Sequence, residues 1–340
     1  MKYRRMGSSG LTLSEIAFGC GGNAGLMVRG SLSEQVHVVA RALELGITYF
    51  DNSPDYGGGL AEENLGRVLK QIKTRPVLNS KVEIRAENLH DIAGHIVRST
   101  QESLSRLGVD YLDVLQVHNG PIHPNPVMEG KYYSQLGVEH FLCDGGVLDG
   151  VRQILERGLV RHTGFICRGN DGVYVRQMLD MGLWGLINVP FTLLNPTAGY
   201  DPGPGFTGKD FGGVLNAAHL AGVGSSIYSP LAGGFLADNS VAGLDGHPLA
   251  RKSPDPLQAT SHKQRQAAAK LQFLSQQSGL SLAQAAYRFI LMHEGVTTVL
   301  GGFSSIEQLE EITRVPDLAP FSPDLIAQVQ ALWARDFRDE

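Results

Sequence analysis

The chain alternates short β-rich segments with longer amphipathic segments, and it does so eight times. The expected strands span 15–19, 47–51, 76–82, 111–118, 160–166, 183–191, 223–229 and 296–302. The expected helices span 33–46, 61–72, 88–108, 146–158, 172–182, a stretch near 212–221, helices across 262–293, and 304–312. Strict alternation of strand and helix predicts a parallel sheet. Eight repeats favour closure of that sheet into a barrel.

A doubly wound open sheet is the alternative to a barrel. It calls for the pattern GxGxxG after the first strand, whereas residues 18–25 read FGCGGNAG. We therefore expect a single α/β domain over residues 1–340, a (β/α)8 TIM barrel with two additions. An N-terminal hairpin over 2–14 turns at Ser8–Gly10, and an extra C-terminal helix spans 323–337. Ser33 is the expected cap of the first helix.

Composition excludes several classes of function. A net charge of −5 provides no basic field for nucleic acid or an anionic membrane. No segment approaches the roughly 20 apolar residues that cross a bilayer, and the basic N-terminus lacks an apolar signal core. Three widely spaced cysteines fit neither a disulfide framework nor a zinc pattern. A reducing, cytoplasmic location is therefore expected.

Three long segments rich in glycine and proline follow expected strands, over 119–145, 196–212 and 237–261. In a barrel, the loops after the strands build the active-site face. These segments are candidate walls of a substrate pocket. The alternative is that each is an insertion without function.

Four titratable groups gather at the carboxyl ends of three consecutive expected strands: Asp51, Tyr56, Lys81 and His118. A buried Lys81 needs a charge partner, which Asp51 can supply. A charged Lys81 beside Tyr56 is expected to lower the phenol pKa, so that Tyr56 can give or take a proton at a substrate oxygen. His118 would orient that oxygen. Taken singly, such a histidine or ion pair is more often structural, but the four together predict a catalytic site.

The chain resembles the aldo-keto reductase superfamily over nearly its whole length. The resemblance lies in FDNSPDYGGGLAEENLG (50–66), NSKV (79–82) and LDVLQVHN (112–119). It implies that the four residues form a catalytic tetrad. It also implies hydride transfer between NAD(H) or NADP(H) and a carbonyl, alcohol or sugar lactol carbon, with the tyrosine as general acid and base. The implied partners are small aldehydes, ketones or sugars.

Segments near the C-terminus resemble the cofactor-binding parts of that family. In IYSPLAGGFL (227–236), the resemblance implies that Tyr228 stacks on the nicotinamide and that the backbone from Ser229 wraps the pyrophosphate. Ser304 and Ser305 begin an expected helix, where free N–H groups favour phosphate, although they could be a mere helix cap. The cofactor-binding residues predicted in this way are Asn188, Tyr228, Ser229, Leu231, Gly233, Gly302, Ser304, Ser305, Gln308 and Glu311.

Two departures from the family pattern bear on the cofactor. Ile166 and Cys167 stand where the family usually has Ser-Asn against the carboxamide. Residues 301–311 contain no Lys or Arg to hold a 2′-phosphate, and they resemble the sugar-oxidising, L-galactose dehydrogenase-like branch. We expect NAD to be accepted at least as well as NADP, with a lean toward oxidation. Arg251 or Lys252, from a distant loop, could supply the missing charge.

Two other functions stay open at this level. One is a non-catalytic, nicotinamide-binding regulatory subunit, since the chain also resembles potassium-channel β subunits of the same fold. The other is a metal-dependent barrel hydrolase, which needs clustered histidine ligands at the strand ends. His118 and His123 have no obvious further ligand beside them, so no metal is expected.

Overall fold

Eight parallel strands close into a barrel in the computed structural model, which describes residues 1–124, 135–168, 172–237 and 259–339. Around the barrel the order is β3, β4, β5, β6, β9, β10, β11 and β12, which pairs with β3 again. Their bounds are Ile16–Gly19, Tyr49–Asp51, Val77–Val82, Leu112–Val117, Val160–Ile166, Leu186–Pro190, Gly224–Tyr228 and Thr298–Gly302. The (β/α)8 TIM barrel predicted from the alternation is confirmed.

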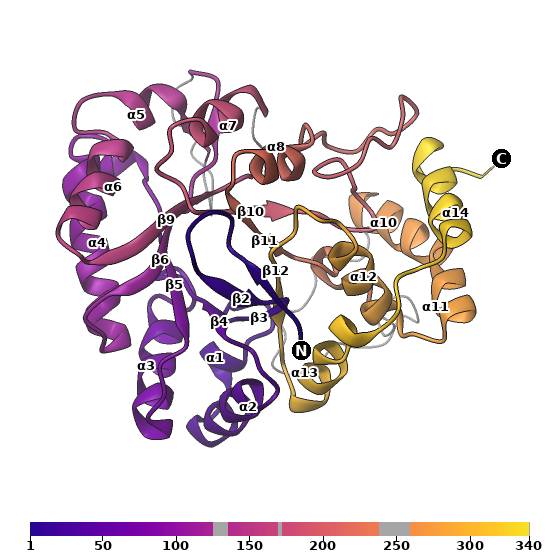
Figure 1. Cartoon of the computed structure of the whole chain (residues 1–340), viewed down its shortest axis with the longest axis horizontal. Helices are drawn as coiled ribbons and strands as arrows, with labels where there is room; N and C mark the ends of the chain where they lie inside the picture. The colour runs from indigo at the N-terminus through magenta and orange to yellow at the C-terminus, as the bar shows by residue number, and fades with distance from the viewer. Residues whose placement is uncertain (125–134, 169–171, 238–258, 340) are drawn as a thin grey trace.

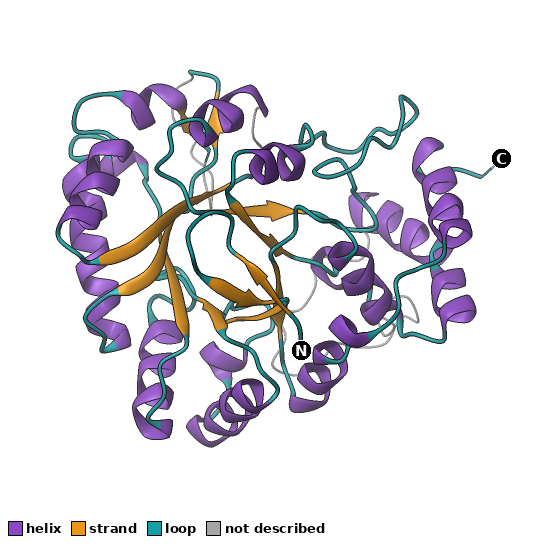
Figure 2. Cartoon of the chain, in the orientation of Figure 1, coloured by secondary structure: helices purple, strands orange, loops and turns teal. Residues whose placement is uncertain are grey.

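Helices surround the barrel, as Figures 1 and 2 show. Those between or after the barrel strands are α2 Leu32–Glu44, α3 Leu60–Ile72, α4 Ile92–Leu107, α6 Val147–Glu156, α7 Gly172–Leu179, α8 Val214–Leu220, α12 Leu282–Leu291 and α13 Ile306–Thr313. Shorter or additional ones are α1 Leu26–Arg29, α5 Val138–Leu142, α10 Ala259–Lys270, α11 Gln272–Ser278, α14 Pro323–Ala334, and the 3-10 turns η1 Ala86–Asn88, η2 Ala232–Gly234 and η3 Val315–Asp317. None of the described helices is long and apolar enough to traverse a bilayer.

The expected cap of the first long helix is wrong by two residues. α2 begins after Ser31, whose hydroxyl accepts from the Glu34 amide, while the Glu34 carboxylate accepts from the Ser31 amide. This reciprocal pair satisfies two amides that the helix cannot satisfy itself. Ser33 therefore lies inside the first turn. The strand-facing side of α2 is apolar, with Val38, Val39 and Ala42 buried against the barrel.

The N-terminal hairpin covers the bottom of the barrel (Figure 1). Its strands, β1 Tyr3–Arg5 and β2 Thr12–Ser14, are antiparallel, and Met6 at the turn is fully buried. Met6 packs with Tyr49, Val114 and Leu186 inside the barrel. A side chain at Gly224 would come within 2.7 Å of Met6, so glycine is required for this approach. With the bottom filled, chemistry is left to the carboxyl ends of the strands.

The three long segments differ in how far the structure describes them. The first contains a small parallel pair, β7 Pro121–Ile122 with β8 Leu136–Gly137, followed by α5. The aromatic residues Tyr132 and Tyr133 lie outside the described residues, and so does most of 237–261, including Arg251 and Lys252. Residues 196–212 are described and form an irregular loop between β10 and α8.

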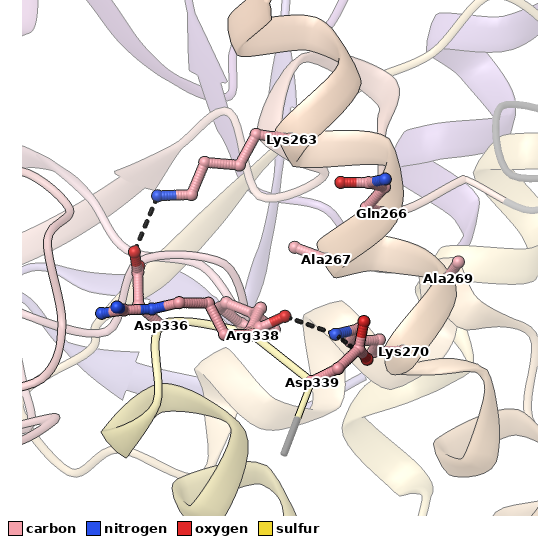
Figure 3. A pocket seen from close by; sticks show the side chains of 9 residues that line it. Lys263, Gln266, Ala267, Ala269, Lys270, Asp336, Arg338 and Asp339 are labelled. Carbon is pink, nitrogen blue, oxygen red and sulfur yellow. Dashed lines mark hydrogen bonds and ion pairs between the residues drawn. The ribbon is translucent and has the colours of Figure 1, made fainter.

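A cavity of about 540 Å³ lies between α10 and the C-terminal residues 336–339 (Figure 3). Its charged walls are paired with each other: Lys263 with Asp336 at 2.8 Å, and Lys270 with Asp339 at 2.6 Å. None of the predicted catalytic residues lines it. The pairs attach the C-terminal segment to α10, which is a structural role.

Candidate active site

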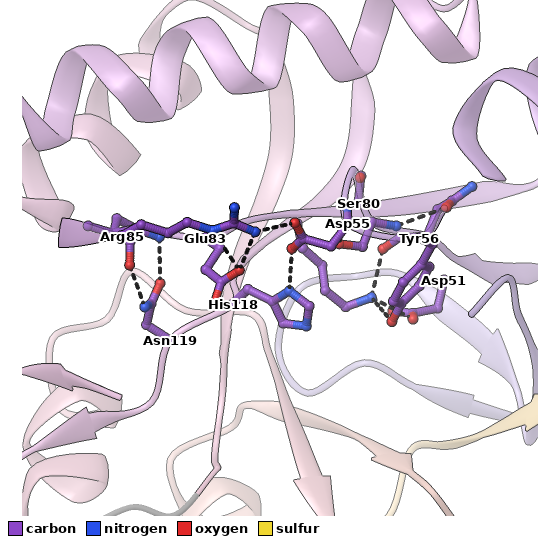
Figure 4. Close-up of polar contacts among 12 residues, drawn as sticks. Asp51, Asp55, Tyr56, Ser80, Glu83, Arg85, His118 and Asn119 are labelled. Carbon is purple, nitrogen blue, oxygen red and sulfur yellow. Dashed lines mark hydrogen bonds and ion pairs between the residues drawn. The ribbon is translucent and has the colours of Figure 1, made fainter. Parts of the chain in front are cut away.

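The four predicted catalytic residues meet at the carboxyl ends of neighbouring strands (Figure 4). Asp51 is the last residue of β4, Lys81 lies in β5, and His118 directly follows β6. Lys81 Nζ lies 2.6 Å from Asp51 Oδ2 and 3.1 Å from Tyr56 Oη. Parallel pairing of adjacent strands brings these groups to one depth. The proximity expected from their positions in the sequence is therefore what the structure contains.

Lys81 is held as a buried cation. Its side chain is 1% exposed and that of Asp51 is 2% exposed. Besides the Asp51 carboxylate, the Asn52 backbone carbonyl accepts from Nζ at 2.7 Å. The third donor hydrogen serves Tyr56, whose ring centroid is 4.8 Å from Nζ. An ammonium group has three donors, so Lys81 is fully satisfied when it is charged.

A chain of hydrogen-bonded side-chain amides holds the Asp51 carboxylate in place. Asn79 Nδ2 donates to Asp51 Oδ1 at 2.6 Å and to Gln116 Oε1 at 3.0 Å. Gln116 Nε2 in turn donates to Asn188 Oδ1 at 2.8 Å. These buried residues belong to β5, β6 and β10, and the sequence alone did not single out Asn79 or Gln116. The network fixes both the Asp51 carboxylate and the predicted carboxamide contact, Asn188.

The Tyr56 phenol does not have the lowered pKa that the neighbouring lysine led us to expect. Burial raises the pKa of Tyr56 well above its usual value, and the Asp51 carboxylate raises it further. The negative charge that neutralises Lys81 thus also acts against ionisation of the phenol. At neutral pH Tyr56 carries its proton and is a hydrogen-bond donor toward the barrel mouth.

His118 is neutral in this setting. Burial lowers the pKa of His118 well below its usual value, and the charges of Lys81, Arg168 and Arg85 lower it further. His118 Nδ1 faces Asp55 Oδ2 at 3.5 Å (Figure 4). A neutral imidazole has one ring nitrogen that donates and one that accepts, so His118 can meet either a carbonyl oxygen or a hydroxyl.

Asp55 is a site residue that sequence reasoning missed. It precedes Tyr56, and its carboxylate is held by Arg85 Nη2 at 2.8 Å. Arg85 also pairs with Glu83 at 3.1 Å, so the anion facing His118 is itself held in place. The signal available in the sequence was an acidic residue next to the predicted proton donor. Nothing in the sequence indicated that it would turn toward a histidine 63 positions away.

The predicted pyrophosphate segment forms a tight turn directly after β11. Ser229, Ala232 and Gly233 have φ values of 52°, 49° and 73°, and residues 232–234 make the turn η2. Within the turn, the Ala232 amide donates to the Ser229 carbonyl at 2.8 Å and the Gly234 amide donates to the Leu231 carbonyl at 2.9 Å. Leu231 packs against the core, and Tyr228 at the strand end donates to the Cys167 carbonyl at 3.4 Å. Its contact with a cofactor pyrophosphate remains a prediction.

The second predicted cofactor segment begins α13. Gly302 is exposed, and its Cα lies where a side chain would come within 3.2 Å of Ala24. Ser304 Oγ donates to the Ala24 carbonyl at 2.7 Å, and the Ser304 amide donates to Gln308 Oε1 at 2.8 Å. Ser305 caps the helix through the Gln308 amide. A phosphate at this helix start must therefore displace the Gln308 side chain.

The acidic residues of this segment have partners of their own. Glu310 pairs with Arg41 on α2 at 2.7 Å, and Glu311 accepts from the hydroxyl of Ser281, the cap of α12. Both carboxylates thus join neighbouring helices. The contact of Glu311 with adenosine remains a prediction, and the structure adds a structural role for this residue.

At the end of β9, Cys167 stands at a position where the family usually has a cofactor-binding residue. Cys167, at the position of the family's carboxamide-binding amide, is fully buried, and its own amide donates to the Asn188 carbonyl. Arg168, which follows it, is half-buried with its guanidinium 5.5 Å from the centroid of the Tyr228 ring. Phe141, in the long segment that follows β6, is fully buried in the hydrophobic core. Arg168, like Asp55, Asn79 and Gln116, is a residue at this end of the barrel that the sequence did not single out.

Comparisons with known proteins agree with this geometry. The Aldo/keto reductase family model matches residues 15–185 and 207–334. The chain is 26% identical to an L-glyceraldehyde 3-phosphate reductase of Escherichia coli O157:H7, covering 97% of this chain and 91% of the relative. It is 25% identical to L-galactose dehydrogenase of Arabidopsis thaliana, covering 98% and 94%. The holo form of an aldo-keto reductase from Bacillus halodurans has the same fold, with a TM-score of 0.69, 20% identity and coverage of 98% and 96%.

The buried ion pair predicts a non-additive effect on stability. Lys81→Met leaves the Asp51 carboxylate buried without its cation, and we expect the free energy of unfolding to fall by about 3–5 kcal/mol. Adding Asp51→Asn removes the stranded charge, so the double variant should be more stable than Lys81→Met alone. Urea denaturation followed by circular dichroism measures the wild type, Lys81→Met, Asp51→Asn and the double variant. Strictly additive losses would contradict the coupling.

The lowered pKa of His118 predicts a stability loss in acid. The unfolded chain binds a proton at this residue near pH 6.5, whereas the folded chain does so only at lower pH. Stability therefore falls as pH drops below about 6.5. His118→Gln should flatten this slope by at most about 1.4 kcal/mol per pH unit. Thermal unfolding at several pH values tests this, with the exposed His123→Gln as control; equal slopes in wild type and His118→Gln would refute it.

Proposed function

Because the chain belongs to the aldo/keto reductase family, we propose that it is a nicotinamide-dependent oxidoreductase with Tyr56 as the general acid and base. The observation that carries the proposal is the contact of Lys81 Nζ with both Asp51 and Tyr56 in a buried setting. The reaction moves a hydride between the cofactor and a carbonyl, alcohol or sugar lactol carbon.

In the reducing direction, the substrate carbonyl oxygen gains the Tyr56 proton. The raised pKa keeps that proton on Tyr56 at neutral pH until the oxygen develops negative charge. The phenolate that remains faces Lys81 Nζ, which donates to it without any change of geometry. In the oxidising direction the same phenolate accepts the proton of the alcohol. Tyr56 thus serves both directions of one reversible reaction.

In this scheme His118 positions the substrate oxygen. As a neutral imidazole, it can donate to the carbonyl oxygen in the reducing direction or accept from the alcohol or lactol hydroxyl in the oxidising direction. A cationic imidazole at this position would be repelled by the Lys81 ammonium. The lowered pKa of His118 keeps the imidazole neutral and so avoids this repulsion.

The residues present fit a nicotinamide dinucleotide along β10, β11 and β12. When bound, the cofactor gives or takes the hydride. Tyr228 would face the nicotinamide ring, and Asn188, held by Gln116, would hold the carboxamide. The turn from Ser229 through Leu231 and Gly233 would hold the pyrophosphate. The remaining predicted contacts, at the adenosine end, are Gly302, Ser304, Ser305, Gln308 and Glu311.

We propose that NAD is accepted at least as well as NADP. At the start of α13, the Ser304 amide and hydroxyl are already used by Gln308 and Ala24. Arg41 on the neighbouring helix is paired with Glu310, and residues 301–311 contain no cation of their own. A 2′-phosphate carries close to two negative charges, and residues 301–311 offer no cation to pair with them.

Small aldehydes, ketones and sugars are the substrate class we propose. L-glyceraldehyde 3-phosphate reductase and L-galactose dehydrogenase, the relatives described above, are named for a small aldehyde and for a sugar. Cys20, Cys143 and Cys167 are free thiols, which suits the reducing cytoplasm that we propose as the location.

Tyr56→Phe tests the proton donor directly. The variant keeps the ring and loses the hydroxyl, so we expect kcat to fall by about 10²- to 10⁴-fold while cofactor affinity changes little. The readout is nicotinamide absorbance with panels of aldehydes and sugars. Tyr49→Phe, which removes another buried hydroxyl two residues before Asp51, is the matched control and should keep its activity.

The same assay separates the enzyme from the non-catalytic alternative. A regulatory subunit would bind the cofactor but show no turnover with any substrate of the panel. Undiminished turnover in Tyr56→Phe would instead remove Tyr56 from its assigned role.

The cofactor proposal predicts comparable affinities for NAD⁺ and NADP⁺. Glu307 is exposed in the first turn of α13, and Glu307→Arg places a cation where the 2′-phosphate is expected. We expect this variant to bind NADP⁺ several-fold more tightly and NAD⁺ unchanged, measured by intrinsic-fluorescence titration. Glu156→Arg, an equal charge change on the exposed side of α6, is the control. A strong preference of the wild type for NADP⁺ that Glu307→Arg does not alter would overturn the proposal.

A further inference from the structure

Asp55 and Tyr56 lie in one turn directly after β4. The Asp55 amide donates to Ser53 Oγ at 3.2 Å, and the Tyr56 amide donates to the Ser53 carbonyl at 3.1 Å. From this turn the Tyr56 hydroxyl reaches Lys81. The Asp55 carboxylate instead faces His118 (Figure 4). A shift of the turn therefore moves the proposed proton donor together with the group that faces the histidine.

The main chain at His118 is fixed against the segment that ends β5. The His118 amide donates to the Val82 carbonyl at 2.7 Å. The Asn119 side chain accepts from the Ile84 amide at 2.8 Å and donates to the Ile84 carbonyl at 2.9 Å. These bonds determine where the histidine begins, whereas the direction of its ring depends on what the side chain contacts.

The carboxylate of Asp55 has a fixed direction of its own. Its Oδ1 accepts from Arg85 Nη2 at 2.8 Å, and Arg85 also pairs with Glu83 at 3.1 Å. The Glu83 side chain is only 4% exposed, so this end of the chain of contacts is anchored in the protein interior. With Oδ1 held by Arg85, Oδ2 lies 3.5 Å from His118 Nδ1.

The contact between Asp55 and His118 has the character of a positioning contact. Its length of 3.5 Å exceeds that of an ordinary hydrogen bond. Catalytic contacts are commonly long before the substrate binds and shorten in the complex. Asp55 Oδ2 is shielded from solvent, so a substrate at the barrel mouth meets the histidine and not this oxygen. An effect of this carboxylate on the reaction therefore passes through the imidazole.

We propose that Asp55, held by Arg85, is a positioning residue that fixes the His118 imidazole relative to Tyr56. This inference rests on the proposed oxidoreductase function and adds a residue to it. Tyr56 and His118 have to reach the same substrate oxygen, although they follow different strands. Asp55 joins them, because it shares the turn of one and contacts the ring of the other. A misplacement of about 1 Å between such groups can cost about 100-fold in rate.

A double-mutant cycle in kcat tests whether Asp55 acts through His118. Asp55→Asn keeps the size of the side chain and removes its charge, and we expect kcat to fall by about 10- to 100-fold with cofactor affinity unchanged. In the His118→Gln background the same substitution should lower kcat by less than about 2-fold, because the imidazole that it positions is gone. Asp110→Asn, at an exposed aspartate before β6 and so at the end opposite His118, is the matched control and should keep the wild-type kcat.

A second cycle tests the part played by Arg85. Arg85→Gln should lower kcat in the same direction as Asp55→Asn but by less, and it should have no further effect in the Asp55→Asn protein. Arg98→Gln removes another exposed arginine that pairs with an aspartate at 2.8 Å, and it should leave kcat unchanged. Strictly additive losses of Asp55→Asn and His118→Gln would contradict the proposal, and so would an undiminished kcat in Asp55→Asn.

Imidazole ¹⁵N NMR of the full chain needs no turnover and so keeps this inference separate from the proposed activity. The His118 signals, assigned by their loss in His118→Gln, should shift in Asp55→Asn and stay in place in Asp110→Asn. His95 Nε2 contacts the Glu83 carbonyl at 2.9 Å, and its unchanged signals would show that the segment after β5 has not moved. Unchanged His118 signals in Asp55→Asn would refute the positioning role even if the enzyme is active. Absence of wild-type turnover together with shifted His118 signals would refute only the proposed function.

Discussion

The ion pair between Lys81 and Asp51 is the constraint on which the rest of the barrel mouth depends. Each charge alone would cost several kcal/mol to bury, and their attraction offsets this only if every remaining donor and acceptor is satisfied. The chain meets that condition with the Asn52 carbonyl, Asn79 and, beyond them, Gln116. These groups come from β4, β5 and β6, so the pair is satisfied only after these strands have paired in this register. The network ends at Asn188 on β10 and so reaches the predicted cofactor side.

The same pair determines the acid–base character of Tyr56. Lys81 alone would favour the phenolate, but Asp51 and burial outweigh it, and the pKa of Tyr56 is raised. Tyr56 is therefore a proton donor. Its phenolate form is stabilised only when the substrate oxygen takes the proton. Burial is the larger cause of this raised pKa and the Asp51 charge adds to it, so the phenol keeps its proton until a substrate oxygen takes it.

Sequence patterns predicted the barrel and the four strand-end residues because both depend on periodicity and on parallel register. Lys81 and Asp51 had to meet once β4 and β5 were adjacent. The contact between Asp55 and His118 was not predictable in this way, because it depends on which direction a loop side chain takes. The partners of Glu310 and Glu311 lie on α2 and α12, so an acidic segment that suggested phosphate repulsion also joins helices. The cap of α2 was missed although the spacing distinguishes the two serines, because Ser31 has Glu34 three positions later whereas Ser33 has Val36.

The barrel mouth divides its tasks among neighbouring strands. Proton chemistry lies after β4, β5 and β6, and the predicted cofactor turns lie after β11 and β12. The arc between them, after β9 and β10, carries Arg168 and Lys209. Although the chain has a net charge of −5, the cations at this mouth concentrate positive potential where an anion approaches. The same potential keeps His118 neutral, because Lys81, Arg168 and Arg85 all lower its pKa. A neutral His118 can then donate with one ring nitrogen and accept with the other.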